Sequence, residues 1–166
     1  MKTFIILKAL ALVLIFSVTS YSQQTDNWQW LNPKPQGNTI YAMDFVIYNS
    51  GYAAGKYGTI LKTIDNGENW TKLNTGISDR FLSIDFVDAN TGFAGGDNQL
   101  LMKTTDAGQN WFNLVLPSAP DFYNYDIDFI NSNTGYVLGF FQLESMIWKT
   151  TDGGGSWSTQ TTDGAN

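Results

Sequence analysis

The sequence predicts an all-β protein, a β-propeller of four-stranded blades in which about three blades form a partial ring. Three observations predict this fold. The octapeptide TIDNGENW at residues 63–70 nearly returns at 104–111 and at 150–157. The three closing tryptophans are 41 and 46 residues apart, and a period of about 42 residues is that of a propeller blade. No segment after residue 23 shows sustained helical spacing with caps.

Each period contains four predicted strands. In the second copy these are LSIDFVD, TGFAGGD, LLMKTTD and NWFNLV, with Gly-, Asn- and Asp-rich turns between them. Short β-branched and aromatic runs between such turns indicate strand–turn–strand structure. A Gly-aromatic pair opens the second strand of every copy, at Gly51, Gly92 and Gly135. We expect the blades at about residues 38–74, 79–116 and 122–162, within a propeller region of 38–166.

The N-terminus is expected to be an export signal. Lys2 and Lys8 precede the apolar run 9–16, and small or polar residues follow it. This order is typical of a secretory signal peptide. The uncharged run is shorter than the roughly 20 residues that cross a bilayer. We therefore predict a signal peptide at 1–22, and an N-terminal strand (NWQWL) with a proline-containing linker at 23–37.

Charge and composition narrow the range of partners. The formal net charge is −6, and removal of the leader, which carries Lys2 and Lys8, makes it more negative. An acidic surface repels nucleic acid and anionic lipid. We expect neither nucleic acid nor, after cleavage of the leader, a membrane as a partner. The predicted location is exported: periplasmic, outer envelope or extracellular.

The repeated octapeptide is interpreted as a structural turn. Its Asp can accept hydrogen bonds from backbone N–H groups of its own turn, and its Gly can take a backbone conformation that is costly for other residues. The Thr adds a hydroxyl, and the Trp begins the outer strand and buries a large ring between blades. Equivalent positions in successive blades rotate away from one another, so three such carboxylates do not converge on one site. The twelve residues are Thr63, Asp65, Gly67, Trp70, Thr104, Asp106, Gly108, Trp111, Thr150, Asp152, Gly154 and Trp157.

The pattern Thr-x-Asp-x-Gly-x-x-Trp resembles the Asp-box, or bacterial neuraminidase repeat. The wider stretch NTGFAGGDNQLLMKTTDAGQNW resembles the photosystem II assembly/stability factor family of propellers, and the resemblance covers nearly all of residues 27–162. Sialidases with this repeat hold their substrate with three arginines, whereas this chain contains Arg80 alone. The photosystem-assembly members are thought to bind partners through a basic, Arg-containing patch, which this acidic chain lacks.

Catalysis is not expected. The chain has no His and no Cys, which excludes Ser-His-Asp and Cys-His triads and zinc sites with N and S ligands. We predict no metal and no cofactor. Asp-box propellers also include glycoside hydrolases that use two carboxylates. The candidates outside the repeated turn are Asp44, Asp85, Asp97, Asp121, Asp126, Asp128 and Glu144.

The predicted function is that of an exported, non-catalytic scaffold that binds a protein or glycan. The alternative is a fragment of an Asp-box glycoside hydrolase whose catalytic residues lie mostly outside this chain. An insertion in the third copy lengthens one hairpin with apolar side chains, which we predict as a possible contact with a partner. Three blades leave two open flanks, which predicts either the N-terminal part of a longer propeller or a homodimer that closes a ring. The insertion residues are Phe140, Phe141, Leu143 and Met146.

Overall fold

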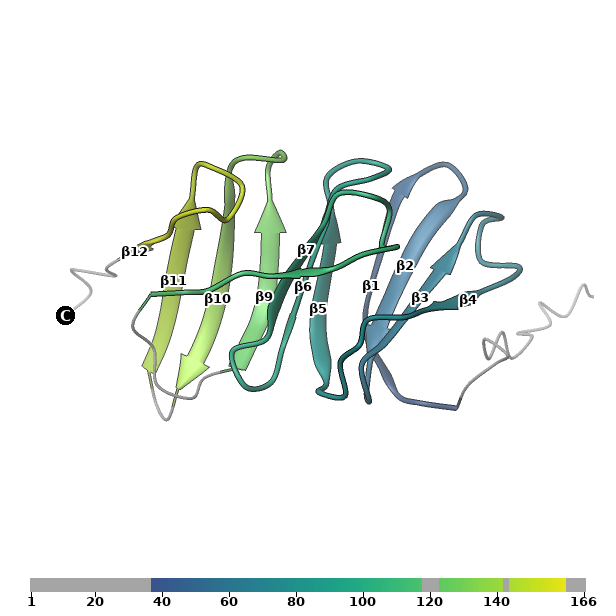
Figure 1. The fold of residues 1–166 in the computed structure, drawn as a ribbon, viewed down its shortest axis with the longest axis horizontal. Coiled ribbons are helices and arrows are strands. Elements are labelled where there is room, and N and C mark those ends of the chain that lie inside the picture. The colour runs from purple at the N-terminus through teal and green to yellow at the C-terminus, as the bar shows by residue number, and fades with distance from the viewer. Residues whose placement is uncertain (1–36, 118–122, 142–143, 161–166) are drawn as a thin grey trace, which may run out of the picture. The chain divides into compact units, whose positions relative to one another are not determined.

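The computed structural model describes residues 37–117, 123–141 and 144–160, which lie in one compact unit. Within these ranges the chain forms three antiparallel sheets of four strands and no helix (Figure 1). The predicted all-β propeller with three four-stranded blades is therefore confirmed. The predicted leader at 1–22 and nearly all of the segment 23–37 lie outside the described residues.

In each blade the strands pair in chain order. Blade 1 contains β1 (Ile40–Ile47), β2 (Ser50–Gly55), β3 (Thr59–Thr63) and β4 (Thr71–Leu73). Blade 2 contains β5 (Phe81–Phe86), β6 (Gly92–Gly96), β7 (Leu101–Thr104) and β8 (Phe112–Asn113). Blade 3 contains β9 (Tyr123–Phe129), β10 (Gly135–Phe141), β11 (Glu144–Thr150) and β12 (Ser158–Gln160). The first strands are neighbours, with β1 beside β5 and β5 beside β9. None of the described segments is a helix that could cross a membrane.

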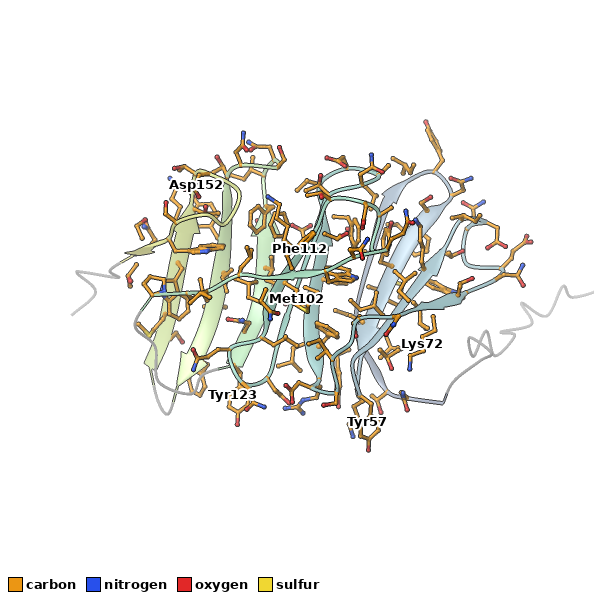
Figure 2. All side chains as sticks on the ribbon, in the orientation of Figure 1. Tyr57, Lys72, Met102, Phe112, Tyr123 and Asp152 are labelled. Carbon is orange, nitrogen blue, oxygen red and sulfur yellow. The ribbon has the colours of Figure 1, made fainter. Side chains whose placement is uncertain are left out.

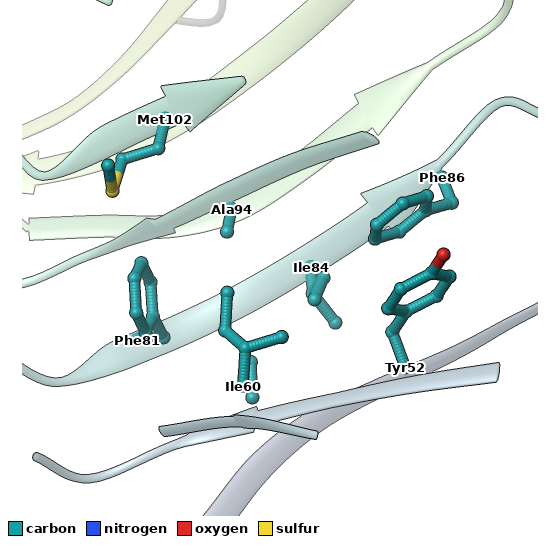
Figure 3. Packing of buried hydrophobic residues seen from close by; sticks show 8 residues of the cluster. Tyr52, Ile60, Phe81, Ile84, Phe86, Ala94 and Met102 are labelled. Carbon is teal, nitrogen blue, oxygen red and sulfur yellow. The ribbon is translucent and has the colours of Figure 1, made fainter. Parts of the chain in front are cut away.

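Aromatic stacking joins each blade to the next. The ring of Tyr52 in β2 lies 3.5 Å from that of Phe86 in β5, at an interplanar angle of 6° (Figure 3). Phe93 in β6 stacks in the same way on Phe129 in β9, at 3.4 Å. Buried aliphatic side chains surround both stacks. Burial raises the pKa of the Tyr52 hydroxyl to about 12. The hydrophobic core therefore lies between the blades, as the aromatic-rich repeats require.

The Gly-aromatic pair at the start of each second strand has a steric reason. The ring of Phe86 lies over Gly92, so that a Cβ at that glycine would be 2.5 Å from Cδ1 of the ring. Gly51 is covered in the same way by Phe45, and Gly135 by Phe129. In the second and third copies the glycine lets the Phe ring lie on the backbone of its own blade while the ring's other face stacks on the preceding blade.

The fourth strands differ from the prediction in where they begin. Trp111 was expected to open its outer strand, but β8 begins one residue later, as β4 and β12 begin after Trp70 and Trp157. In the first two copies the indole Nε1 donates to the carbonyl of the turn glycine at 3.1 Å. These tryptophans therefore belong to the turn rather than to the strand.

Candidate binding face

The repeated octapeptide forms a closed turn between the third and fourth strands. In the first copy, Thr63 Oγ1 donates to Asp65 Oδ1 at 2.7 Å and accepts from the N–H of Gly67 at 2.9 Å. Asp65 Oδ1 also accepts from the N–H of Asn69 at 2.8 Å, and Oδ2 accepts from the Asn69 amide at 2.8 Å. The Asp65 carboxylate and the buried Thr63 hydroxyl thus stabilise the turn by hydrogen bonds to its own backbone and side chains.

The second and third copies repeat this network. Asp106 accepts from Thr104 and Asn110 at 2.7–2.9 Å. In the third copy, Ser156 takes the place of the asparagine and donates its N–H and hydroxyl to Asp152. In the second copy, the hydrogen bond from the backbone N–H of Asn110 contributes most to lowering the pKa of Asp106. In the third copy, the pKa of Asp152 is lowered to about 2, and the hydrogen bond from the Ser156 hydroxyl is the largest cause.

These contacts are confined to single turns, and each turn belongs to a different blade. Figure 2 places Asp152 at one end of the strands and Tyr57 and Tyr123 at the other. An aspartate whose oxygens already accept hydrogen bonds from its own turn is poorly placed to act as a catalytic acid. The contacts support the interpretation of the motif as structural.

A second repeated aspartate links the blades. Asp44 Oδ2 in β1 accepts a hydrogen bond from the N–H of Phe86 at 2.8 Å. Asp85 Oδ2 in β5 accepts from the N–H of Phe129 at 2.7 Å. Asp128 occupies the same position in β9. Burial raises the pKa of Asp85 to about 6, against the lowering effect of the Phe129 N–H, and nearby carboxylates add to the rise.

The other candidate carboxylates have different surroundings. Asp97 binds Arg80 through two hydrogen bonds of 2.8 Å, to Nε and Nη2. Asp126 Oδ1 accepts from the next backbone N–H at 3.0 Å. Asp121 and the side chain of Glu144 lie outside the described residues. In the part of the chain that the structure describes, no group of three or more His, Cys, Asp or Glu residues could hold a metal ion.

The sequence does not predict the partner of Arg80, which the structure pairs with Asp97. Its guanidinium lies 5.6 Å from the ring centroid of Tyr41. The hydrogen bonds to Asp97, followed by that to Tyr41, raise the pKa of Arg80 above its ordinary value. The Asp97 N–H also donates to the Arg80 carbonyl at 3.0 Å. This bidentate pair holds the 74–80 connection against the β6–β7 hairpin. It uses the Nε and Nη2 donors of the Arg80 guanidinium.

The end of the blades opposite the Asp-box turns carries an open pocket. The pocket, of about 260 Å³, lies between the β2–β3 hairpin and the connection that follows β4. Thr75 Oγ1 holds the two sides together by donating to the Gly58 carbonyl at 2.9 Å. Tyr57 stands beside the pocket with 68% of its surface exposed. We call this end the hairpin face; the pocket is lined by Tyr57, Gly58 and residues 72–77.

The insertion in the third copy does lengthen a hairpin, because β10 and β11 pair as far as Phe141 and Glu144. Its predicted contact residues do not gather on one described surface. Met146 packs against the core between blades 2 and 3, and Phe140 is half-buried. Leu143 and the side chain of Phe141 lie outside the described residues.

The fold and the turns define a section of an Asp-box β-propeller. The chain belongs to the family described as photosynthesis system II assembly factor YCF48, whose pattern matches residues 20–122. A comparison with curated proteins found no match to this chain.

Solved structures support the same relationship. YCF48 bound to a D1 peptide is 29% identical, with a TM-score of 0.65 over 75% of this chain and 41% of that one. YCF48 from Cyanidioschyzon merolae is 24% identical, with a TM-score of 0.64 over 76% and 38%. The GH74 xyloglucanase from Xanthomonas campestris shares the fold at 16% identity, with a TM-score of 0.58 over 75% and 22%. The chain thus spans less than half the length of these proteins.

Proposed function

We propose that the chain is an exported, non-catalytic propeller module that binds a segment of a partner protein. The observation that carries the proposal is the similarity to YCF48 that was solved with a D1 peptide, at 29% identity over three quarters of the chain. That relative accommodates a peptide on the same fold. The partner of this chain is therefore expected to present a peptide segment.

The hairpin face is the part of the described chain that best suits such a segment. It combines the exposed ring of Tyr57 with the pocket of about 260 Å³ and its backbone groups at Gly58 and residues 74–77. Exposed tyrosines contribute a large, rigid contact area at little cost in conformational entropy. At the opposite face the polar side chains are occupied by their own Asp-box turns.

Export is proposed from the N-terminal sequence, which has two lysines, an apolar run and small residues in signal-peptide order. The mature chain would then meet its partner in the periplasm, at the outer envelope or outside the cell. The acidic balance of the chain favours a basic or neutral segment over an acidic one.

The alternative function is that of a glycoside hydrolase fragment. The likeness to GH74 enzymes extends to the fold alone, at 16–19% identity. Asp44 and Asp85 use a carboxylate oxygen to hold a backbone N–H of the next blade, and Asp97 is paired with Arg80. Each of these contacts has a structural purpose, which favours binding over hydrolysis.

The proposal is tested with the purified full chain on two probes. The first is an array of overlapping peptides that includes the D1 peptide, and the second is xyloglucan, with reducing-sugar release as the readout. We expect saturable binding to a subset of peptides and no sugar release. Sugar release by the wild-type chain would favour the hydrolase, and an array without saturable binding would contradict the peptide-binding function.

A further inference from the structure

We propose that the segment bound at the hairpin face carries an acidic side chain, whose carboxylate is held by Lys72 and Asn74 beside the ring of Tyr57. The inference rests on the proposed function, because it names the chemistry of the segment that this face binds. It concerns the pocket of about 260 Å³ between the β2–β3 hairpin and the connection that follows β4. Figure 2 labels two of the side chains that line it, Tyr57 and Lys72, on blade 1.

Three backbone N–H groups that line the pocket are already used within the chain. The N–H of Gly58 donates to the Asp79 carbonyl at 2.8 Å. The N–H of Gly76 donates to Asn74 Oδ1 at 3.2 Å, and that of Ile77 donates to a threonine hydroxyl of the same connection at 3.3 Å. Peptide C-termini are captured by clusters of free backbone N–H groups. These three groups are not free for a terminal carboxylate, which leaves the side chains to bind a polar group of the ligand.

The side-chain groups that remain in the pocket are hydrogen-bond donors. Within the described ranges Lys72 has no acidic partner. Asn74 Oδ1 accepts from the Gly76 N–H, so its Nδ2 is the group left for a ligand. An ammonium group and an amide nitrogen can donate hydrogen bonds but cannot accept them. A carboxylate accepts hydrogen bonds and carries a charge opposite to that of the lysine, so it complements this pair of donors.

The exposure of these side chains does not depend on whether a further blade lies beside blade 1. Blade 2 lies between the other two blades and shows the same positions with a neighbour on each side. Its equivalent of Tyr57 is Asn98, which is exposed. Its equivalent of Lys72 is Asn113, which is exposed as well. Because the lysine and the tyrosine do not recur in blade 2, the fold does not require them, and a ligand explains them better.

Tyr57 has a backbone conformation that another residue would adopt more easily. Its φ is 56° and that of Gly58 is 62°, as in hairpin turns whose two central residues both have positive φ. In the equivalent turn of blade 2, Asn98 has a φ of 54°. Asparagine is favoured in this region, whereas a bulky aromatic residue there is an outlier. Since Tyr57 is 68% exposed, packing within the described chain does not account for it. Such outliers cluster at binding sites, where the ring could pack against the residue next to the carboxylate.

The net charge of the chain limits what else the segment contains. The formal net charge is −6, which disfavours a segment rich in acidic residues. The donors of the pocket nevertheless require one acceptor of negative charge. A segment that is neutral or basic overall, with a single aspartate or glutamate for Lys72, satisfies both conditions.

The test uses the full chain and the strongest peptide of the array, acetylated and amidated at its ends so that only side chains supply carboxylates. Each Asp or Glu of the peptide is changed in turn to Asn or Gln, and the affinity is measured by fluorescence anisotropy. We expect one of these changes to weaken binding by about three- to tenfold. Lys72→Gln should weaken binding of the unchanged peptide to the same extent. The matched control is Lys149→Gln in β11 of blade 3, which should bind as the wild type does.

A variant of the second donor addresses Asn74. Asn74→Asp keeps an acceptor for the Gly76 N–H but replaces the Nδ2 donor with a carboxylate oxygen. It should weaken binding of the unchanged peptide, because two carboxylates then face each other. It should affect the neutralised peptide less. Equal weakening of both peptides would contradict the role of Asn74 as a donor to the carboxylate.

Combining the protein and peptide changes isolates the contact. If Lys72 holds the peptide carboxylate, Lys72→Gln should not further weaken binding of the neutralised peptide. The affinity of the variant should also depend less on salt than that of the wild type. Additive effects, a strongest peptide without Asp or Glu, or a peptide that binds only with a free C-terminus would overturn the inference and leave peptide binding intact. An array without saturable binding would instead overturn the proposed function on which the inference rests.

Discussion

The carboxylate of Asp44 holds the backbone N–H of Phe86, 42 residues later, at 2.8 Å. Asp85 repeats the contact with Phe129 at 2.7 Å. The same Phe rings stack on the preceding blade. The first-strand Phe thus takes part in both the polar and the apolar contact of a junction. The stability of the unit should therefore depend most on residues at these junctions.

The first prediction concerns the pH dependence of stability. Burial raises the pKa of Asp85 from 3.8 to about 6. Between these values the native state holds a proton that the unfolded chain has released, so stability rises as the pH falls from about 6 towards 4. We expect a gain of about 1 to 2 kcal/mol, because partial solvation reduces the full effect. Urea unfolding of the wild type and of Asp85→Asn between about pH 6 and 4 measures this gain in stability. An equal gain in the variant would show that Asp85 is not its source.

The Asp-box carboxylates have the opposite dependence at lower pH. The pKa values of Asp65, Asp106 and Asp152 are lowered by the hydrogen bonds of their turns, that of Asp152 to about 2. Their contribution is present above the unfolded value of 3.8 and is lost as the pH falls through the folded values. The melting temperature should therefore decline below about pH 4. Asp106→Asn should flatten this decline, and an unchanged acid profile would count against the structural role.

The buried hydroxyl of the second Asp-box is the third target. Thr104 Oγ1 accepts from the N–H of Gly108 at 2.9 Å and is fully buried. Thr104→Val leaves that N–H without its partner, which should lower the free energy of unfolding by about 1 to 3 kcal/mol. The control is Thr71→Val at an exposed strand position. Equal effects of the two substitutions in urea unfolding would refute the expectation.

The fourth prediction separates backbone strain from crowding at glycine. Gly76 and Gly108 have φ values of 69° and 84°. A Cβ at Gly76 meets nothing within 4 Å, whereas one at Gly108 would lie 2.6 Å from Leu73 Cδ1. Gly76→Ala should lower the free energy of unfolding by about 1 kcal/mol, because alanine must adopt the left-handed backbone conformation. Gly108→Ala should lower the free energy of unfolding by more, since the Leu73 side chain must also move. Thermal melts of the two variants measure the difference in stability.

The repeated parts of the structure were predictable because their causes are local. The Thr-x-Asp-x-Gly-x-x-Trp spacing encodes a turn whose hydrogen bonds lie within the repeated octapeptide itself. The repeat period indicates four strands per blade. The contact between Asp44 and Phe86 was not predicted, because it joins residues of different blades. The salt bridge of Arg80 with Asp97 was missed for the same reason, although the lone arginine was visible in the sequence. Met146 was predicted with the insertion residues as a partner contact, and it packs, partly buried, against the core between blades 2 and 3.

The central claim is that the hairpin face binds a peptide segment. It is tested most directly by the affinity of the wild type, Tyr57→Ala and Ile64→Ala for the strongest peptide of the array, measured by fluorescence anisotropy. The two side chains are equally exposed, at 68% and 67%, but lie at opposite ends of the blades. We predict that Tyr57→Ala weakens binding by about tenfold or more, as loss of an aromatic anchor does, while Ile64→Ala binds as the wild type does. Equal affinities, or weakening by Ile64→Ala alone, would contradict the account.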